Sequence, residues 1–208
     1  ESSFNVGIAD VLSKQIASKV LLAALPNDGS VHLRCLESTH EMLLAQLREH
    51  KLDVILSDCP LDSTQHPDLL SKKLGECGVS FFCQAPLPEK PFPECLMERK
   101  LLIPAKRTAM GRQLTRWFDE QGLAPQIFGE FDDAALMKAF GLFNQGIFVA
   151  PTLYEEEFLD GQTVALLAQT DALKEEYYAI FAERMIQHPA VKRLCESDFS
   201  ALFAGLEQ

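Results

Sequence analysis

The sequence predicts an α/β protein of two Rossmann-like lobes joined by a hinge. Short apolar segments of strand length alternate with segments whose apolar residues recur at helical spacing. The alternation runs twice, over residues 5–58 and over residues 101–151, with a proline-rich stretch between the two runs. Alternating strands and helices favour parallel strands, because each parallel connection needs a long crossover.

The first run predicts the order β-α-β-α-β. Strands are expected at residues 5–10, 31–36 and 53–58, and the third is continuously apolar, as in a strand covered on both faces. The second helix is expected to begin at Ser38, because Ser38 to Glu41 fit the S-x-x-E capping box. The first helix is predicted from an apolar stripe of Ile16, Ala17, Val20, Leu21, Ala24 and Leu25.

The second run repeats this order. Strands are expected at residues 101–104, 126–130 and 147–151. Thr108 is predicted to cap the helix after the first of these strands, and Asp132 the helix after the second, because hydroxyl and carboxylate oxygens accept the free N–H groups of a helix start.

Prolines between residues 86 and 93 mark the predicted junction, after a strand at residues 78–84. The tail carries apolar segments at residues 163–167 and 177–182, and a final helix at residues 189–204 with a proline in its first turn. We expect the final helix to return to the first lobe. The predicted lobes are residues 1–82 with 179–208, and residues 83–178.

Composition and motifs exclude several classes of function. The 19 Lys and Arg residues against 30 Asp and Glu give a net charge of −11, which argues against nucleic-acid binding by this chain alone. The sequence has no apolar run of about 18 residues that could cross a membrane. It has no P-loop, G-x-S-x-G or H-E-x-x-H motif, so we expect no enzyme and no cofactor. The six cysteines lack zinc-ligand spacing and are expected to be reduced, small buried residues.

Three segments resemble the effector-binding domain of LysR-type transcriptional regulators. They are the first strand at residues 4–7, the helix start at residues 130–137, and the strand at residues 146–151 that begins Gly-Ile and ends in Pro. The resemblance implies the fold of type II periplasmic-binding proteins and no covalent chemistry. It also implies a winged helix-turn-helix that is absent from this chain, in agreement with the acidic charge.

Four further segments resemble, within this family, the activators of sodium/proton antiporter genes: residues 34–44, 57–60, 89–93 and 179–189. This implies a cytoplasmic transcription activator that responds to sodium. The implied partners are a second copy in a homodimer (a tetramer at full length), promoter DNA through the absent domain, RNA polymerase, and sodium or a small anion as effector, with no membrane. In such dimers the first helix and second strand of one copy meet the final helix of the other.

The effector site is expected outside the carboxyl ends of the parallel strands, where open α/β sheets bind ligands. The candidate residues end strands or begin helices: Asp10, Ser13, Ser38, Thr39, Glu41, Asp58, Pro104, Arg107, Thr108, Phe131 and Asp132. Their carboxylate and hydroxyl oxygens suit a hard cation. Glu41 is the preferred sodium ligand, because the resemblance is strongest around it and it lies at a helix start.

Several candidates also have a purely structural explanation. Glu41 fits a capping box, and Asp10, Asp58 and Asp132 fit turns or helix caps. A different possibility is that His40 titrates near neutrality and makes the domain sense pH.

Anion binding and redox chemistry are also compatible with the sequence. Helix starts attract anions, so Lys14, Lys106 or Arg107 could hold a carboxylate in place of a cation, although a solvated basic edge also explains them. Cys77 and Cys83 could form a redox pair, although packing in the core also explains both cysteines. The alternative function is a periplasmic solute-binding protein for a small ligand.

Overall fold

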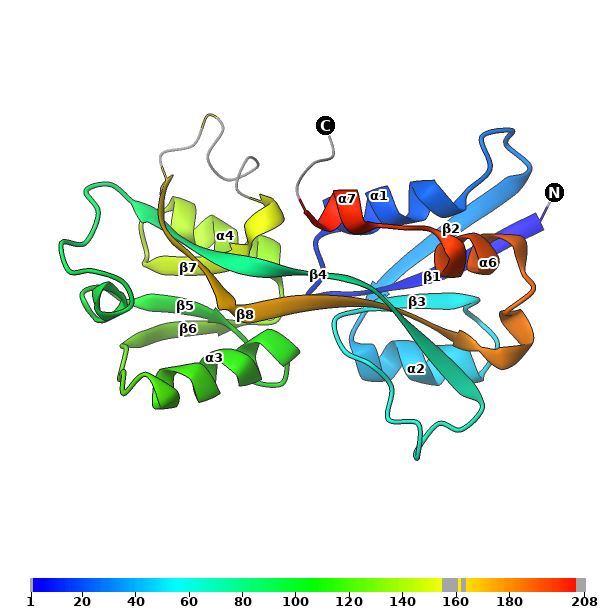
Figure 1. The fold of residues 1–208 in the computed structure, drawn as a ribbon, viewed down its shortest axis with the longest axis horizontal. Coiled ribbons are helices and arrows are strands. Elements are labelled where there is room, and N and C mark those ends of the chain that lie inside the picture. The colour runs from blue at the N-terminus through cyan, green and yellow to red at the C-terminus, as the bar shows by residue number, and fades with distance from the viewer. Residues whose placement is uncertain (1, 155–160, 162–163, 205–208) are drawn as a thin grey trace. The chain divides into compact units, whose positions relative to one another are not determined.

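The computed structural model describes residues 2–154, 161 and 164–204 and has a mixed α/β fold (Figure 1). Its contacts divide the chain into two units. Unit 1 comprises Glu1–Gly75 and Glu176–Gln208, and unit 2 comprises Glu76–Glu175. The chain passes from one unit to the other within two long strands, β4 (Leu69–Gln84) and β8 (Val164–Ala182).

In unit 1 the strands follow the order β2-β1-β3-β8. β1 (Ser2–Ala9) pairs in parallel with β2 (Val31–Ser38) and with β3 (Val54–Ser57), which confirms the predicted parallel pairing. β8 runs antiparallel to β3, a direction that the sequence analysis did not predict. β8 enters unit 1 directly from unit 2. A helical crossover from β3 would have made the two strands parallel, but no such crossover connects them.

Helices that pack on unit 1 include α1 (Lys14–Ala24), α2 (His40–Arg48) and α6 (Pro189–Glu196). The buried residues of α1 are those of the predicted stripe, except for Leu25 at its end: Ile16, Ala17, Val20, Leu21 and Ala24. α6 packs against α1, as expected for the returning end of the chain.

The predicted final helix is in fact two short helices. α6 ends at Glu196, and Ser197 after it is extended, with ψ 143°. The carboxylate of Asp198 then accepts hydrogen bonds from the backbone N–H and the hydroxyl of Ser200, at 2.9 and 2.5 Å, and α7 (Ser200–Phe203) begins there. This local turn competes with continued helix, as short polar side chains often do.

In unit 2 the strands follow the order β4-β7-β5-β6. β5 (Leu101–Pro104) pairs in parallel with β6 (Ile127–Phe131) and β7 (Ile147–Pro151), as predicted, and β4 runs antiparallel to β7. The crossovers between the parallel strands are α3 (Ala109–Glu120) and α4 (Ala134–Leu142).

An aromatic cluster fixes α3 on the sheet of unit 2. Phe81 of β4 lies 6.3 Å from Trp117 of α3 and 5.5 Å from Phe92, measured between ring centroids, and Trp117 lies 5.7 Å from Phe92. Phe81 is fully buried. Because these rings hold the middle of α3, they also fix the position at which the helix begins, beside the end of β5.

Two strands are longer than the sequence predicted. β4 begins at Leu69, nine residues before the expected start at residue 78, and β8 joins the two predicted tail segments into one strand. The predicted tail segment also includes Thr163, which lies outside the described residues. Short 3-10 helices occupy Glu94–Met97, Thr152–Tyr154 and Glu183–Met185. Within the described part of the chain, no helix is both long and apolar enough to cross a membrane.

Candidate functional site

The carboxyl ends of β1 and β2 bring several candidate residues of unit 1 together. Ala9 and Ser38 are register partners at the ends of these strands, and the backbone N–H of Asp10 donates to the carbonyl of Ser38 at 2.9 Å. Ser13 follows as the N-cap of α1, where its hydroxyl accepts from the N–H groups of Gln15 and Ile16. Because β1, β2 and β3 are parallel, their carboxyl ends lie at one edge of the sheet, and Asp10, Ser13 and Ser38 line it.

The end of β3 continues this edge with buried polar side chains. Ser57, the last residue of β3, is fully buried, and Asp58 after it is buried as well. The hydroxyl of Ser57 lies 2.7 Å from Nδ1 of His40, the first residue of α2, and donates to the carboxylate of Asp58 at 3.4 Å. The start of α2 is thus tied directly to the end of β3.

The helix cap at this edge is Thr39, which corrects the predicted capping box at Ser38. Ser38 stays in β2, since its carbonyl accepts the Asp10 N–H, and the hydroxyl of Thr39 accepts from the N–H of Met42 at 3.3 Å. Glu41 is therefore the second residue of α2, not the third, and it is exposed in the first turn. This removes its explanation as the acid of a capping box with Ser38, while the helix dipole still favours an acid there.

The cation nearest this edge is already engaged. Lys14 donates to the carbonyls of Asp10 and Leu12, at 3.1 and 2.9 Å, and forms an ion pair with Glu37 at 3.1 Å. Its charge is balanced by Glu37, and Asp10 and Asp58 place two further carboxylates at this edge. This disfavours the alternative in which Lys14 holds an anionic ligand.

In unit 2 the candidate residues meet at the carboxyl ends of β5 and β6. Pro104 and Phe131 are register partners, and the N–H of Ala105 donates to the carbonyl of Phe131 at 2.8 Å. Thr108 caps α3 as predicted: its buried hydroxyl accepts from the N–H of Gly111 at 3.0 Å and donates to the carbonyl of Ala105 at 2.7 Å.

Asp132 is not the cap of α4, which corrects the prediction. Asp133 is the N-cap and accepts from the N–H groups of Ala135 and Leu136, at 2.8 and 3.4 Å. The carboxylate of Asp132 instead accepts from Nε of Arg107 at 2.9 Å. This pair, like Lys14 with Glu37, offers a ligand no net charge, which disfavours Arg107 as the holder of an anion.

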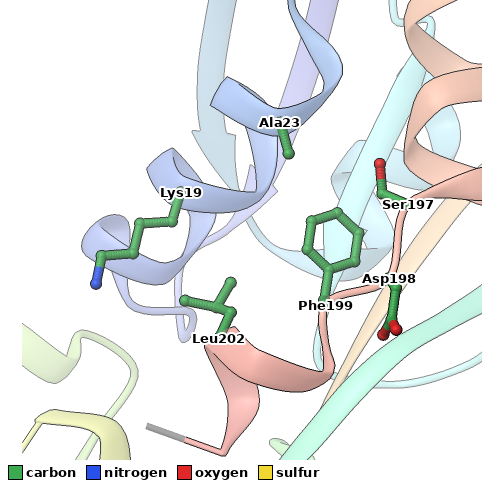
Figure 2. Close-up of a pocket in the computed structure, with 6 residues that line it drawn as sticks. All are labelled: Lys19, Ala23, Ser197, Asp198, Phe199 and Leu202. Atoms are coloured by element: carbon green, nitrogen blue, oxygen red, sulfur yellow. The ribbon is translucent and has the colours of Figure 1, made fainter. Parts of the chain in front are cut away.

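Two further observations concern metals and cavities. Over residues 2–154, 161 and 164–204, no three His, Cys, Asp or Glu side chains form a group that could hold a metal ion. A cavity of about 330 Å³ in unit 1 lies between α1 and the segment that joins α6 to α7 (Figure 2). None of the candidate site residues lines it; its lining is Lys19, Ala23, Ser197, Asp198, Phe199 and Leu202.

All six cysteines are free thiols, and they differ in surroundings. Cys77, Cys83 and Cys95 are buried as predicted, and burial raises the pKa of the Cys83 and Cys95 thiols. Cys35 is exposed, and Cys59 and Cys195 are partly buried, so burial was predicted for too many of them. A raised pKa makes a thiol a poorer nucleophile near neutrality, which argues for Cys83 as a packing residue.

Sequence reasoning missed the contact between His40 and the residues after β3. The sequence suggests His40 only as a pH sensor and Cys59 only as a core residue, yet the two side chains lie 3.5 Å apart, from Nδ1 to Sγ. The signal was available: α2 begins just after the carboxyl end of β2, and β3 is parallel to β2 in the same sheet, so the start of α2 and the end of β3 lie at one edge.

The fold and this edge define a class: a domain that binds small ligands at the carboxyl ends of parallel strands. Residues 1–197 match the LysR substrate binding domain. The chain is 61% identical over 201 residues to the transcriptional activator protein NhaR of Escherichia coli (strain K12), covering 97% of this chain and 67% of that protein. The chain therefore belongs to the LysR substrate-binding domains and is closely related to a transcriptional activator.

Solved structures support the fold. The cofactor-binding domain of the Cbl transcriptional regulator matches with a TM-score of 0.79 at 14% identity, over 94% of this chain and 87% of that one. A reduced form of OxyR from N. meningitidis matches with a TM-score of 0.74 at 15% identity, over 99% of this chain and 98% of that one. The chain thus has the type II periplasmic-binding-protein-like fold of LysR-type effector-binding domains, and the alternative of a solute-binding protein is not favoured.

Proposed function

We propose that this domain senses sodium for a transcription activator that regulates a sodium/proton antiporter gene. The observation that carries the proposal is the acidic, oxygen-rich carboxyl edge of unit 1, in a chain 61% identical to NhaR. In the proposal, units 1 and 2 are lobes I and II of the effector-binding domain. The domain performs no covalent catalysis, acts in the cytoplasm, and reaches promoter DNA and RNA polymerase as part of a longer regulator.

The unit 1 edge has the ligand chemistry of a hard cation. Hard cations take carboxylate, hydroxyl and carbonyl oxygens. Asp10 and Asp58 supply carboxylates. The capping hydroxyl of Thr39 accepts one hydrogen bond and keeps a second lone pair, whereas that of Ser13 already accepts two. Glu41 adds an exposed carboxylate at the start of α2, and we propose it as the sodium ligand that solvent reaches first.

The lobe II residues have a different proposed role. Pro104, Thr108 and Phe131 shape the carboxyl edge of unit 2, where the charges of Arg107 and Asp132 cancel. We propose them as effector contacts that add shape and hydrogen bonding without net charge. An anionic effector is the second candidate, but two of the three basic residues offered for it, Lys14 and Arg107, already carry carboxylate partners.

The test is thermal unfolding of this domain in sodium, potassium and choline chloride at equal ionic strength. Sodium at ten times its dissociation constant adds about 1.4 kcal/mol to the free energy of unfolding. For a chain of 208 residues this raises Tm by roughly 3–6 °C. We expect this shift in sodium only, and its loss in Glu41→Ala.

The matched control is Glu49→Ala, which removes an exposed acid at the other end of α2 and should keep the sodium shift. If the parent protein shows no sodium-specific shift, direct sensing by this domain is wrong. If Glu41→Ala keeps the full shift, sensing stands and the assignment of Glu41 is wrong.

We also propose a homodimer in which α1 and β2 of one copy meet α6 of the other. In support, β2 lies at the edge of the sheet with no buried residue, and Leu22 on the outer face of α1 is 67% exposed. Leu22→Glu should shift sedimentation from dimer to monomer while the domain stays folded, whereas Leu136→Glu, on α4 of unit 2, should leave the dimer intact. A parent protein that sediments as a monomer at high concentration would contradict this interface.

A further inference from the structure

A side chain of α3 holds the long strand β8 by its backbone. The side-chain amide of Gln113 in α3 contacts both backbone polar groups of Lys174 in β8. Its Oε1 accepts from the N–H of Lys174 at 3.1 Å, and its Nε2 donates to the carbonyl of Lys174 at 2.7 Å. We call these two hydrogen bonds the Gln113 clamp. The amide thus makes the pair of bonds that a neighbouring strand makes with one residue of a sheet.

The clamp lies close to the point at which β8 leaves unit 2. The boundary between the units falls after Glu175, so Lys174 is the last residue but one of β8 in unit 2. Beyond the boundary, β8 belongs to unit 1 and pairs with β3 at Tyr178, Ala179 and Ile180. The Gln113 clamp therefore fixes the unit 2 side of the crossing to a helix.

The helix gives the clamp a fixed base. Leu114, the residue after Gln113, is fully buried, and Trp117 lies 6.3 Å from Phe81 of β4 between ring centroids. The amide also has one favourable orientation, because a backbone N–H only donates and a carbonyl only accepts. A rotation of the Gln113 amide by half a turn would break both bonds to Lys174, so the clamp is either closed or open.

The start of α3 is close enough to Gln113 to move it. The N–H of Arg112 donates to the carbonyl of Thr108 at 3.1 Å, so the cap and the first turn behave as one piece of helix. This piece packs tightly on the turn after β5: a Cβ on Gly111 would collide with the carbonyl of Ala105. A displacement of the first turn from Ala105 therefore displaces Gln113 as well.

We propose that the Gln113 clamp couples the start of α3 to the opening of β8 at Lys174. While the first turn of α3 stays against Ala105, the clamp is closed and the Lys174 backbone is protected from water. When the turn moves away, the clamp opens. The clamp is inferred from these contacts alone. Its regulatory use rests on the proposed function, because the proposed effector contacts Arg107 and Thr108 lie at this helix start, where an effector would shift the same equilibrium.

The first experiment is amide hydrogen exchange of the native domain, followed by NMR. We expect the Lys174 amide to be protected and to exchange at least about tenfold faster in Gln113→Met, which removes both hydrogen bonds but keeps the length of the side chain. Gln113→Glu can accept from Lys174 but cannot donate to it, so its rate should lie between these two. The amide of Leu101, which donates to the carbonyl of Gln126 at 2.8 Å, reports on the opening of unit 2 and should change by less than about twofold.

Two outcomes of this experiment would overturn the clamp. One is a Lys174 amide without protection in the parent protein, and the other is an equal Lys174 rate in Gln113→Met. The matched control is Gln145→Met, which removes an exposed glutamine elsewhere in unit 2 and should leave the Lys174 rate unchanged. If the Leu101 amide of Gln113→Met loses its protection, that variant is not folded, and the parent protein and Gln113→Glu decide.

The second experiment tests the coupling with Gly111→Ala, which displaces the first turn of α3. We expect the Lys174 rate to rise at least about threefold relative to the Leu101 rate, and to rise by less than about twofold when Gln113→Met is already present. The same increase in both backgrounds would show that the coupling does not pass through Gln113. A faster Ala105 amide with an unchanged Lys174 rate would show that no coupling exists. Neither measurement uses sodium, so a failure of sodium sensing leaves both results interpretable.

Discussion

Substitution of Gly111 by alanine should destabilise unit 2 through one backbone contact. Gly111 lies in the first turn of α3, and a Cβ built on it would lie 2.1 Å from the carbonyl oxygen of Ala105 and 2.9 Å from Cα of Lys106. Both are backbone atoms, so no side chain can move aside. The start of α3 would have to separate from the turn that follows β5, where Arg107 and Thr108 are placed.

Three contributions set the size of the effect. Alanine in place of glycine favours a helix by up to about 1 kcal/mol. Overpacking of a well-packed site costs about 1–3 kcal/mol. Displacement of Ala105 also weakens the hydrogen bond that its carbonyl accepts from Thr108 at 2.7 Å, which is worth about 1 kcal/mol. The net loss is about 1–3 kcal/mol, or a decrease in Tm of roughly 2–12 °C.

Thermal and urea unfolding measure this loss. The matched control is Gly129→Ala in β6, where the new Cβ meets only the edge of the Phe131 ring at 3.0 Å, a side chain that can turn aside. We expect the control to lose clearly less stability than Gly111→Ala. If Gly111→Ala is as stable as the parent protein, the start of α3 is not held by the contact with Ala105, and the reasoning is refuted.

Two other predictions rest on single contacts. Phe81→Ala should lower the free energy of unfolding by about 3–5 kcal/mol and change the fluorescence of Trp117, which stacks on Phe81. Phe143→Ala, at an exposed position, should change the free energy of unfolding by no more than about 0.5 kcal/mol. A loss below about 1 kcal/mol for Phe81→Ala in urea unfolding would contradict the packing. Hydrogen bonds from Ser200 lower the pKa of Asp198, so this interaction stabilises the folded state above the ordinary carboxyl pKa, and the stabilisation is lost as pH falls through the lowered pKa. NMR titration should show a higher Asp198 pKa in Ser200→Ala, while the pKa of Asp62, which Thr64 holds low, stays unchanged. An unchanged Asp198 pKa in Ser200→Ala would refute Ser200 as the cause.

Apolar periodicity predicted most of the strands and helices but missed the first half of β4 and the middle of β8. The first half of β4, which includes Lys72 and Lys73, is largely exposed, so it lacks the apolar pattern that marks a strand with a buried face. The same holds for the middle of β8. These segments are strands because a neighbouring strand pairs with their backbone, and a single sequence does not show which segments become neighbours.

Helix caps were predicted to within one residue, and tertiary contacts decided between adjacent candidates. Ser38 and Thr39 are both competent caps, but the hydrogen bond from Asp10 keeps Ser38 in β2. Asp132 and Asp133 are both competent as well, and Arg107 holds Asp132. In each case the partner comes from a different strand–helix connection, so local propensity alone could not choose.

The candidate site was predictable as an edge but not as a set of contacts. Parallel order alone places Asp10, Ser38 and Asp58 at the carboxyl ends of adjacent strands. The contact between His40 and Cys59 also requires that the start of α2 lie against the end of β3, a distance of 19 positions along the chain that no motif marks. The fully buried Ser57 contacts both side chains, at 2.7 Å from Nδ1 of His40 and 3.9 Å from Sγ of Cys59, and a serine at the end of an apolar strand does not by itself predict either contact.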